Sequence, residues 1–311
     1  RYFTRCGLFS MWKSPFPGIA AICHSQLQYP QTMSAQSIIF RVAPLLNAPG
    51  RMEKPDPALE LLLCDKREST IGMVKTLAGW NIKRKNKENE ISKMAVQRVR
   101  DLHGDNLPSV LIVDGKDWHL GVIGIVAAKL TQEFDRPVAV LSIQADGLAS
   151  ASARAIPGFN WHKALFECRD LFTRWGGHAN AAGFSILQEN ISTLRERLNS
   201  NPSEYQEPKV LIEKTLPIQV AFTEIDDNLM RWLSQMEPLV GKFSMPLFRA
   251  EKVTICSMRE SPGGHLNLEL SQAGSLRFPG IAFGMGKKKN AIASLGKEVT
   301  VDFEIAWNVF Y

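Results

Sequence analysis

The chain has 311 residues, of which 45% are hydrophobic and 22% are charged. This length and composition predict a globular protein with a sizeable core and two domains. Lysine and arginine together number 37 against 31 acidic residues, and the net charge of +6 suits a polyanionic partner such as nucleic acid. No apolar run approaches the ~18 to 20 residues that cross a bilayer, which excludes a membrane span and a membrane partner.

The five cysteines are widely spaced and include no CxxC pair. This spacing excludes a zinc ribbon or a dithiol redox couple and fits the reducing cytoplasm. The first residues combine Arg1 and Arg5 with apolar positions, but no long apolar stretch follows. We therefore expect a truncated start rather than a signal peptide.

The first predicted elements form a strand–helix–strand unit. Apolar residues recur at helical spacing over 91–102, and a short apolar run at 110–113 predicts a buried strand. Residues 121–134 predict a second helix and 137–143 a second buried strand. Two strands separated by a helix at this spacing indicate a parallel α/β unit.

The α/β pattern continues to about residue 200. We expect an edge strand at 149–154, a helix at 161–175, a strand at 183–187 and a helix at 191–198. Residues 199–208 are polar and include two prolines, which predicts a linker. Two basic clusters, at 83–87 and 287–289, are most simply solvated loops, and each only supports a site argued from other residues.

Beyond the predicted linker the pattern changes to short β runs between Gly, Pro and Ser turns. The clearest runs are 253–255, 266–270, 281–283 and 299–305. About five strands in roughly 100 residues predict a small barrel, with an OB-like fold ahead of an SH3-like barrel or a sandwich. The chain stops at 307–311, inside the last predicted barrel region, so this domain is expected to be incomplete.

Three segments could bind a phosphate. Gly176 and Gly177 precede His178, and paired glycines can aim amide N–H groups into one concavity beside an imidazole donor. Strand alternation places Ser152 and Arg154 on one face, where hydroxyls and a guanidinium suit a phosphate oxygen. Each segment also has an ordinary interpretation: 176–178 as a helix-to-strand turn, and the strand with Ser152 and Arg154 as the solvent side of a sheet edge.

The third segment, 47–51, contains Pro and Gly and predicts a turn between Asn47 and Arg51, although an ordinary loop is the favoured interpretation when this segment is taken alone. Residues 117–119 open the predicted helix at 121–134, whose free N–H groups could receive an anion. Asp117 and His119 alone are too few ligands for a catalytic divalent ion, so no metal site is expected there.

The order of these motifs resembles the RecJ exonuclease family. Residues 118–127 (WHLGVIGIVA), the Ser-x-Arg strand and 176–184 (GGHANAAGF) are similar to that family's DHHA1 domain, and 44–51 (PLLNAPGR) is similar to the end of its DHH domain. The resemblance implies a DHH remnant at 1–85, a DHHA1 α/β domain at 86–200 and an OB-like nucleic-acid-binding domain at 209–311.

The resemblance also implies a function. It predicts part of a 5′-to-3′ single-stranded-DNA exonuclease of repair and recombination, with Mn²⁺ or Mg²⁺ held by motifs absent from this chain, which alone should be inactive. His178 would contact phosphate or act as an acid. The other implied phosphate-binding residues are Asn47, Arg51, Ser152, Arg154, Gly176 and Gly177. The candidates for binding DNA in the barrel are Lys252, Arg259, His265 and Arg277. Phe278 and Phe283 are candidates for stacking, with core packing of half of the aromatic residues as the alternative.

The implied partners are single-stranded DNA and a single-strand-binding protein or helicase, with the chain itself a monomer. Two other functions stay open at this point. One is a DHH/DHHA1 phosphoesterase acting on short oligonucleotides or cyclic dinucleotides, which an appended barrel disfavours. The other is a non-catalytic nucleic-acid-binding protein built on the same fold.

Overall fold

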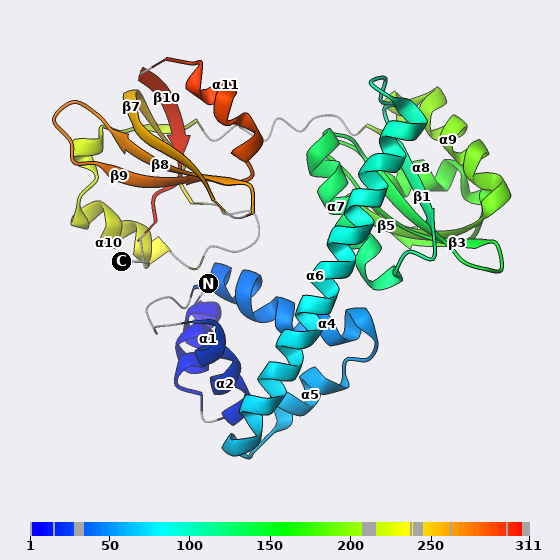
Figure 1. Ribbon diagram of the computed structural model, residues 1–311, viewed down its shortest axis with the longest axis horizontal. Helices are drawn as coiled ribbons and strands as arrows, with labels where there is room; N and C mark the ends of the chain where they lie inside the picture. Colours follow the sequence, from blue (N-terminus) through cyan, green and yellow to red (C-terminus); the bar gives the residue numbers. More distant parts are fainter. Residues whose placement is uncertain are drawn as a thin grey trace. The chain divides into compact units, whose positions relative to one another are not determined.

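A computed structural model describes residues 2–14, 16–27, 34–206, 216–236, 238, 245–261, 263–296 and 298–306. The chain divides into two compact units, one formed by residues 10–211 and the other by residues 1–9 and 212–311. Figure 1 shows their elements, and each unit is described by itself. Within the described ranges, no helix combines the length and hydropathy needed to cross a membrane.

The larger unit begins with short helices, of which α2, α4 and α5 pack on the first half of the long helix α6. These elements are α1 (Tyr2–Trp12, which starts in the other unit), α2 (Pro17–Gln26), α3 (Ala35–Ser37), a π-helical turn (Ile38–Val42), α4 (Ala43–Met52), α5 (Asp56–Leu63) and α6 (Arg67–His103). Ile22, Leu45, Leu61 and Leu77 bury their side chains between α2, α4, α5 and α6. This apolar contact fixes α4 against α6.

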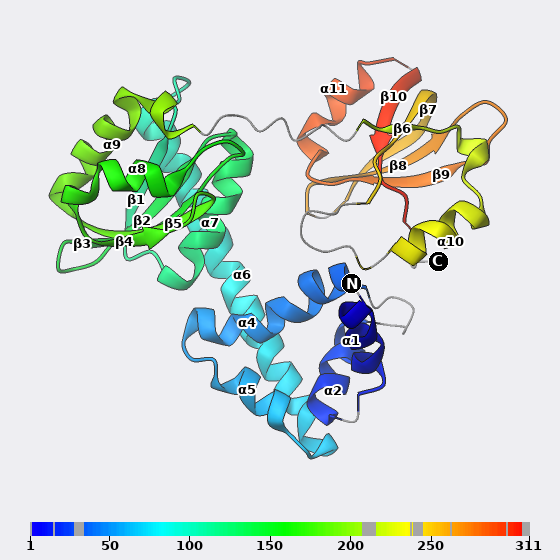
Figure 2. The ribbon, with the colours of Figure 1, turned by 180° about the vertical axis from the view of Figure 1, so that it is seen from behind.

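Helix α6 runs for 37 residues from the helical bundle to the α/β domain, as Figures 1 and 2 show from opposite sides. Only its second half, 91–102, is predicted from the sequence, because the first half lacks a clear apolar period. The basic cluster 83–87, interpreted as a loop, lies inside this helix. Its residues are mostly good helix formers, and the buried Glu88 pairs with Arg84 and with Lys129 of α7.

The α/β domain contains a five-stranded sheet in the order β1-β2-β3-β5-β4. Its elements are β1 (Leu111–Lys116), α7 (Leu120–Phe134), β2 (Val138–Ile143), β3 (Leu148–Arg154), α8 (Trp161–Glu167), a 3₁₀ turn (Arg169–Leu171), β4 (Phe172–Gly177), β5 (Ala181–Leu187), a 3₁₀ turn (Gln188–Asn190) and α9 (Ile191–Ser200). Strands β1 and β2 pair in parallel, which confirms the predicted strand–helix–strand unit.

Two predictions about this sheet are wrong. Strand β3 is central, because β2 and β5 pair with its two edges, whereas it was expected at the sheet edge. The helix expected over 161–175 ends at Glu167, and its second half is β4, the edge strand. Phe172 and Trp175 pack against the same core, and the bulge between Phe172 and Arg174 puts both on one face.

The described part of the predicted linker belongs to the α/β domain. Helix α9 extends to Ser200, and the Asn199 side chain exchanges hydrogen bonds with the backbone of Val110 at 2.9 and 3.0 Å. A 3₁₀ turn (Pro202–Tyr205) then buries Tyr205 edge-to-face against Phe159. The polar residues here bond the backbone and end the helix, a use that composition alone does not distinguish from a linker.

The smaller unit contains a second five-stranded sheet, with β10, β7, β8 and β9 in that order and β6 parallel to β7. Its elements are β6 (Ile218–Gln219), a 3₁₀ turn (Phe222–Glu224), α10 (Asp227–Met236), β7 (Phe248–Ser261), β8 (His265–Ser271), β9 (Phe278–Ala282), a 3₁₀ turn (Gly286–Lys288), α11 (Lys289–Ala293) and β10 (Glu298–Phe303). Phe222, Ala250 and Val253 form the centre of its core.

The described strands of this unit make an open sheet, because no pairing joins β9 to β10 within them. The predicted small barrel is therefore not closed by these residues. A physical reason is that the chain between β9 and β10 folds into a 3₁₀ turn and α11, which supply no strand to close the sheet. The predicted incomplete end at 307–311 lies outside the described residues.

Candidate phosphate-binding site

Ser152 and Arg154 share one face of β3, as strand alternation predicts. Ala149, Ala151 and Ala153 are buried in the core on the other face. The Arg154 guanidinium folds back along the strand, where its Nη1 donates to Ser152 Oγ at 3.1 Å and to the Ala153 carbonyl at 2.7 Å. This face does not lie open to solvent over β3, because α7 packs on β2 and β3 there.

Gly124 of α7 leaves space for the Arg154 guanidinium. A Cβ at Gly124 would lie 2.9 Å from Ser152 Oγ and 3.1 Å from Arg154 Nη2, closer than ordinary contacts. Gly121, one turn earlier, allows an even closer approach, since a Cβ there would lie 1.7 Å from the Arg51 carbonyl oxygen. Two glycines three residues apart therefore shape one face of α7 around two arginines.

Arg51 reaches the same face from α4. Segment 47–51 is helical, so the predicted turn is wrong: the helix continues through Pro49, whose carbonyl accepts from the Glu53 N–H at 2.8 Å. Asn47 and Arg51 are four residues apart and both exposed, which puts them on one helix face. The Arg51 Nη1 donates to the Gly121 carbonyl at 3.2 Å, so its side chain lies at the start of α7.

His119 connects α4 to α7. Its Nδ1 accepts a hydrogen bond from the Gly121 N–H at 3.1 Å, and its Nε2 lies 3.2 Å from the Met52 carbonyl oxygen. Only the tautomer with the proton on Nε2 satisfies both contacts, and the imidazole then caps α7 while it holds the end of α4. The sequence marks His119 as a helix start, but the contact with Met52 depends on tertiary packing.

The positive charges of the Arg51 and Arg154 guanidinium groups repel each other. Burial lowers the pKa of Arg154 from its ordinary value, and the positive charge of Arg51 lowers it further. Among the described residues, no ion pair links either arginine to an acid. Two convergent cations beside a hydroxyl and a helix N-terminus form an arrangement that a phosphate would stabilise.

His178 lies in the turn between β4 and β5, and this is a hairpin turn rather than the predicted helix-to-strand turn. The His178 N–H donates to the Ala181 carbonyl at 2.8 Å, and its side chain is exposed. The Asn180 carbonyl accepts from the Ala155 N–H, which places the turn beside the end of β3. No contact found among the described residues joins the His178 ring to either arginine.

The two glycines before His178 differ. Gly177 has φ +136°, and a Cβ there would lie 2.5 Å from the Ala182 Cα, so the fold itself requires glycine. Gly176 lacks a positive φ, and a Cβ there would meet nothing within 4 Å.

The predicted DNA contacts of the second unit are dispersed. Arg259 is exposed on β7, Lys252 is exposed with φ +53°, and Arg277 pairs with Glu269 at 3.3 Å. His265 accepts from the Gly284 N–H at 2.9 Å and packs edge-to-face on Phe283, which is 73% exposed. Phe278 is partly buried and packs edge-to-face against Phe222 of the core, whereas Phe283 leaves most of its ring exposed.

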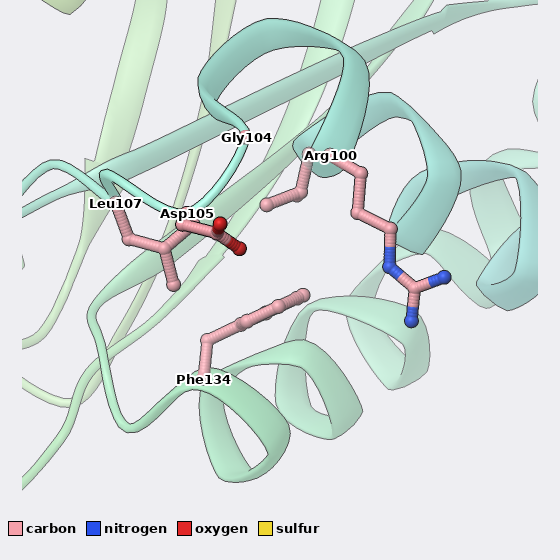
Figure 3. A pocket seen from close by; sticks show the side chains of 6 residues that line it. Arg100, Gly104, Asp105, Leu107 and Phe134 are labelled. Carbon is pink, nitrogen blue, oxygen red and sulfur yellow. The ribbon is translucent and has the colours of Figure 1, made fainter.

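An open pocket of about 380 Å³ lies elsewhere, at the end of α6. Figure 3 shows its lining, in which Phe134 and Leu107 face the space and Arg100 extends along one side. Its lining residues are Val99, Arg100, Gly104, Asp105, Leu107 and Phe134. None of them belongs to the arginine site, which lies at the opposite end of α7.

A divalent metal ion does not fit the arginine site. Two guanidinium groups dominate it, and metal ions of this kind require oxygen ligands with negative charge. Within the described ranges, no group of three or more His, Cys, Asp or Glu side chains could hold a metal. The site is therefore suited to anions.

Comparisons with known proteins identify two domains in this chain. A DHHA1 domain model matches residues 107–203, and a RecJ OB domain model matches residues 217–311. The chain belongs to the RecJ family. The RecJ-type DHHA1 domain thus contains α7, β3 and the His178 turn, whereas Arg51 lies before the matched residues.

Curated RecJ proteins are similar over part of their length. The chain is 37% identical over 186 residues to the single-stranded-DNA-specific exonuclease RecJ of Bacillus subtilis, covering 59% of this chain and 23% of that protein. It is 30% identical over 241 residues to the exonuclease of the same name from Salmonella typhimurium, covering 75% of this chain and 41% of that protein. The matched region is thus less than half of each relative.

A solved RecJ structure has the same fold. The crystal structure of RecJ in complex with Mn²⁺ from Thermus thermophilus aligns with a TM-score of 0.77 at 24% identity. The alignment covers 97% of this chain and 43% of that chain.

Proposed function

We propose that this chain is the strand-binding part of a single-stranded-DNA-specific exonuclease that degrades from the 5′ end in DNA repair and recombination. The supporting observation is the pair of guanidinium groups, Arg51 and Arg154, that converge at the N-terminal end of α7 without an acidic partner among the described residues. Curated RecJ relatives carry the name single-stranded-DNA-specific exonuclease. The basic net charge of +6 agrees with a nucleic-acid ligand.

In this proposal each residue has a separate task. Arg51 and Arg154 bind a strand phosphate, and Ser152 both accepts from Arg154 and donates to a phosphate oxygen. Asn47, on the same helix face as Arg51, supports that contact. His178 contributes a phosphate contact or a proton from the neighbouring hairpin turn, whose shape depends on Gly177.

Hydrolysis would require metal ions bound outside this chain. Crystal structures of Thermus thermophilus RecJ are described as complexes with Mn²⁺ and with Mg²⁺. The described residues of this chain offer no matching ligand group. We propose that the chain by itself binds a strand without cleaving it.

The wider assignments are proposals as well. We propose a DHH remnant at 1–85, a DHHA1 domain at 86–200 and an OB domain at 209–311, although the first boundary falls inside α6. Lys252, Arg259, His265 and Arg277 remain proposed DNA contacts of the OB domain. We also propose a monomer that acts in the cytoplasm, where its five free cysteines stay reduced, together with a single-strand-binding protein or a helicase.

The test is fluorescence anisotropy of the 311-residue chain with single-stranded and duplex oligonucleotides, with and without a 5′ phosphate, in Mn²⁺ buffer that also reports cleavage. We expect single-strand binding that weakens steeply with salt. Arg154→Ala should weaken it at least about tenfold, since a charge-assisted bond contributes ~1.5 to 3 kcal/mol. Arg100→Ala, near the opposite end of α7, is the charge-matched control. Equal effects of the two substitutions, or no binding by the unsubstituted chain, would contradict the proposal.

A further inference from the structure

Helix α7 covers only part of the sheet face that carries Ser152 and Arg154. In the strand register Ser152 pairs with Gly183 of β5, and Gly183 pairs with Gly176 of β4. Helix α7 packs on β2 and β3, whereas Gly183 and Gly176 are exposed. A row of one serine and two glycines therefore leads from the arginine site to the sheet edge.

The next row along the strands carries a third arginine. Ser150 pairs with Ser185, and Ser185 pairs with Arg174 of β4. Because side chains alternate along a strand, Arg174 lies on the same face as Gly176. Arg174 is exposed and forms no ion pair with another residue in the part of the chain that the structure describes.

Neither glycine of this row is required by the fold. Gly176 and Gly183 both lack a positive φ. A Cβ at Gly176 would meet nothing within 4 Å, and one at Gly183 would meet only the Ala151 carbonyl oxygen, at 3.4 Å. Glycine within a strand weakens it and often marks close approach of a ligand or another backbone. Here the space above the two glycines is available to a ligand.

We propose that the exposed face of β5 and β4 is a second phosphate subsite for the nucleic-acid strand, with Arg174 as its cation. This inference rests on the proposed function and extends it. Two strand spacings of ~4.8 Å separate β3 from β4, so a phosphate at Arg174 lies further along the strand than the one at Arg154. Gly176 and Gly183 let the sugar-phosphate chain lie against the sheet between the two arginines.

The probes are 5′-phosphorylated oligo(dT) of four nucleotides and thymidine 5′-monophosphate, each titrated into the full chain and followed by phosphorus NMR. Arg174→Ala should weaken binding of the tetranucleotide about tenfold and leave binding of the mononucleotide unchanged. Gly183→Ala should have the same length-dependent effect, because a methyl group occupies the path of the strand. Arg169→Ala is the charge-matched control with no expected effect, because the Arg169 guanidinium lies over the Phe166 ring of α8 instead.

Each outcome separates the inference from the proposed function. If the unsubstituted chain binds neither probe, the proposed function fails and the second subsite fails with it. If Arg154→Ala weakens both probes but Arg174→Ala and Gly183→Ala change neither, only the second subsite is refuted. Equal weakening of both probes by Arg174→Ala would place Arg174 in the first phosphate site and would also refute the inference. Thermal unfolding should show that Gly183→Ala keeps the fold.

Discussion

Replacing His119 by alanine tests how α4 is held against α7. The substitution removes the acceptor for the Gly121 N–H, 3.1 Å away, and the bond from Nε2 to the Met52 carbonyl, 3.2 Å away. A helix cap and a net hydrogen bond are each worth ~1 kcal/mol, so the free energy of unfolding of the larger unit should fall by ~2 kcal/mol.

The same substitution should affect phosphate binding, because Arg51 directly precedes Met52. Once the end of α4 is released, Arg51 no longer has a fixed position relative to Arg154. Loss of one charge-assisted contact of ~1.5 kcal/mol or more corresponds to at least about tenfold weaker binding of a 5′-phosphorylated single strand.

His119→Asn is the matched control. Asparagine is a good N-cap and restores an acceptor for α7, but it is too short to reach Met52. Urea unfolding followed by circular dichroism should therefore recover ~1 kcal/mol, while anisotropy should still show weakened binding. Unchanged strand affinity in His119→Ala would refute the positioning of Arg51 by His119, and equal stability of the two variants would refute the capping role.

Three further outcomes follow from the geometry. Gly177→Ala should lower the free energy of unfolding by ~1 to 3 kcal/mol because of its positive φ, whereas a thermal melt in which Gly176→Ala is equally damaging would contradict this difference. Glu88→Gln should lower the free energy of unfolding, measured in urea, by ~3 kcal/mol, since Glu88 is 7% exposed and its two cationic partners lose their carboxylate. A decrease below ~0.5 kcal/mol would show that the two ion pairs contribute little to stability. Burial raises the pKa of Cys168 to about 11 from 9.0, so the unfolded thiol ionises first and stability should decline between pH 9 and 11; a Cys168→Ala variant with the same decline would refute this.

Local periodicity gave the correct type for most elements of the α/β domain, because strand alternation and helical spacing are properties of short segments. It also put Ser152 and Arg154 on one strand face. Periodicity failed at 161–175, where a helix and a strand with apolar residues follow each other, and at 83–87, where a helix without an apolar period is supported by Glu88.

The sequence by itself determined the order of the motifs, their resemblance to RecJ, the shared face of Ser152 and Arg154, and the excess of positive charge. Tertiary structure decided which strands are neighbours, and thus that β3 is central and that Gly183 and Gly176 extend its face. It also decided that Arg51 lies beside Arg154, because this depends on α4 packing closely against Gly121. Such contacts join residues far apart in the chain, and packing between elements fixes them, whereas periodicity describes only the element in which each residue lies.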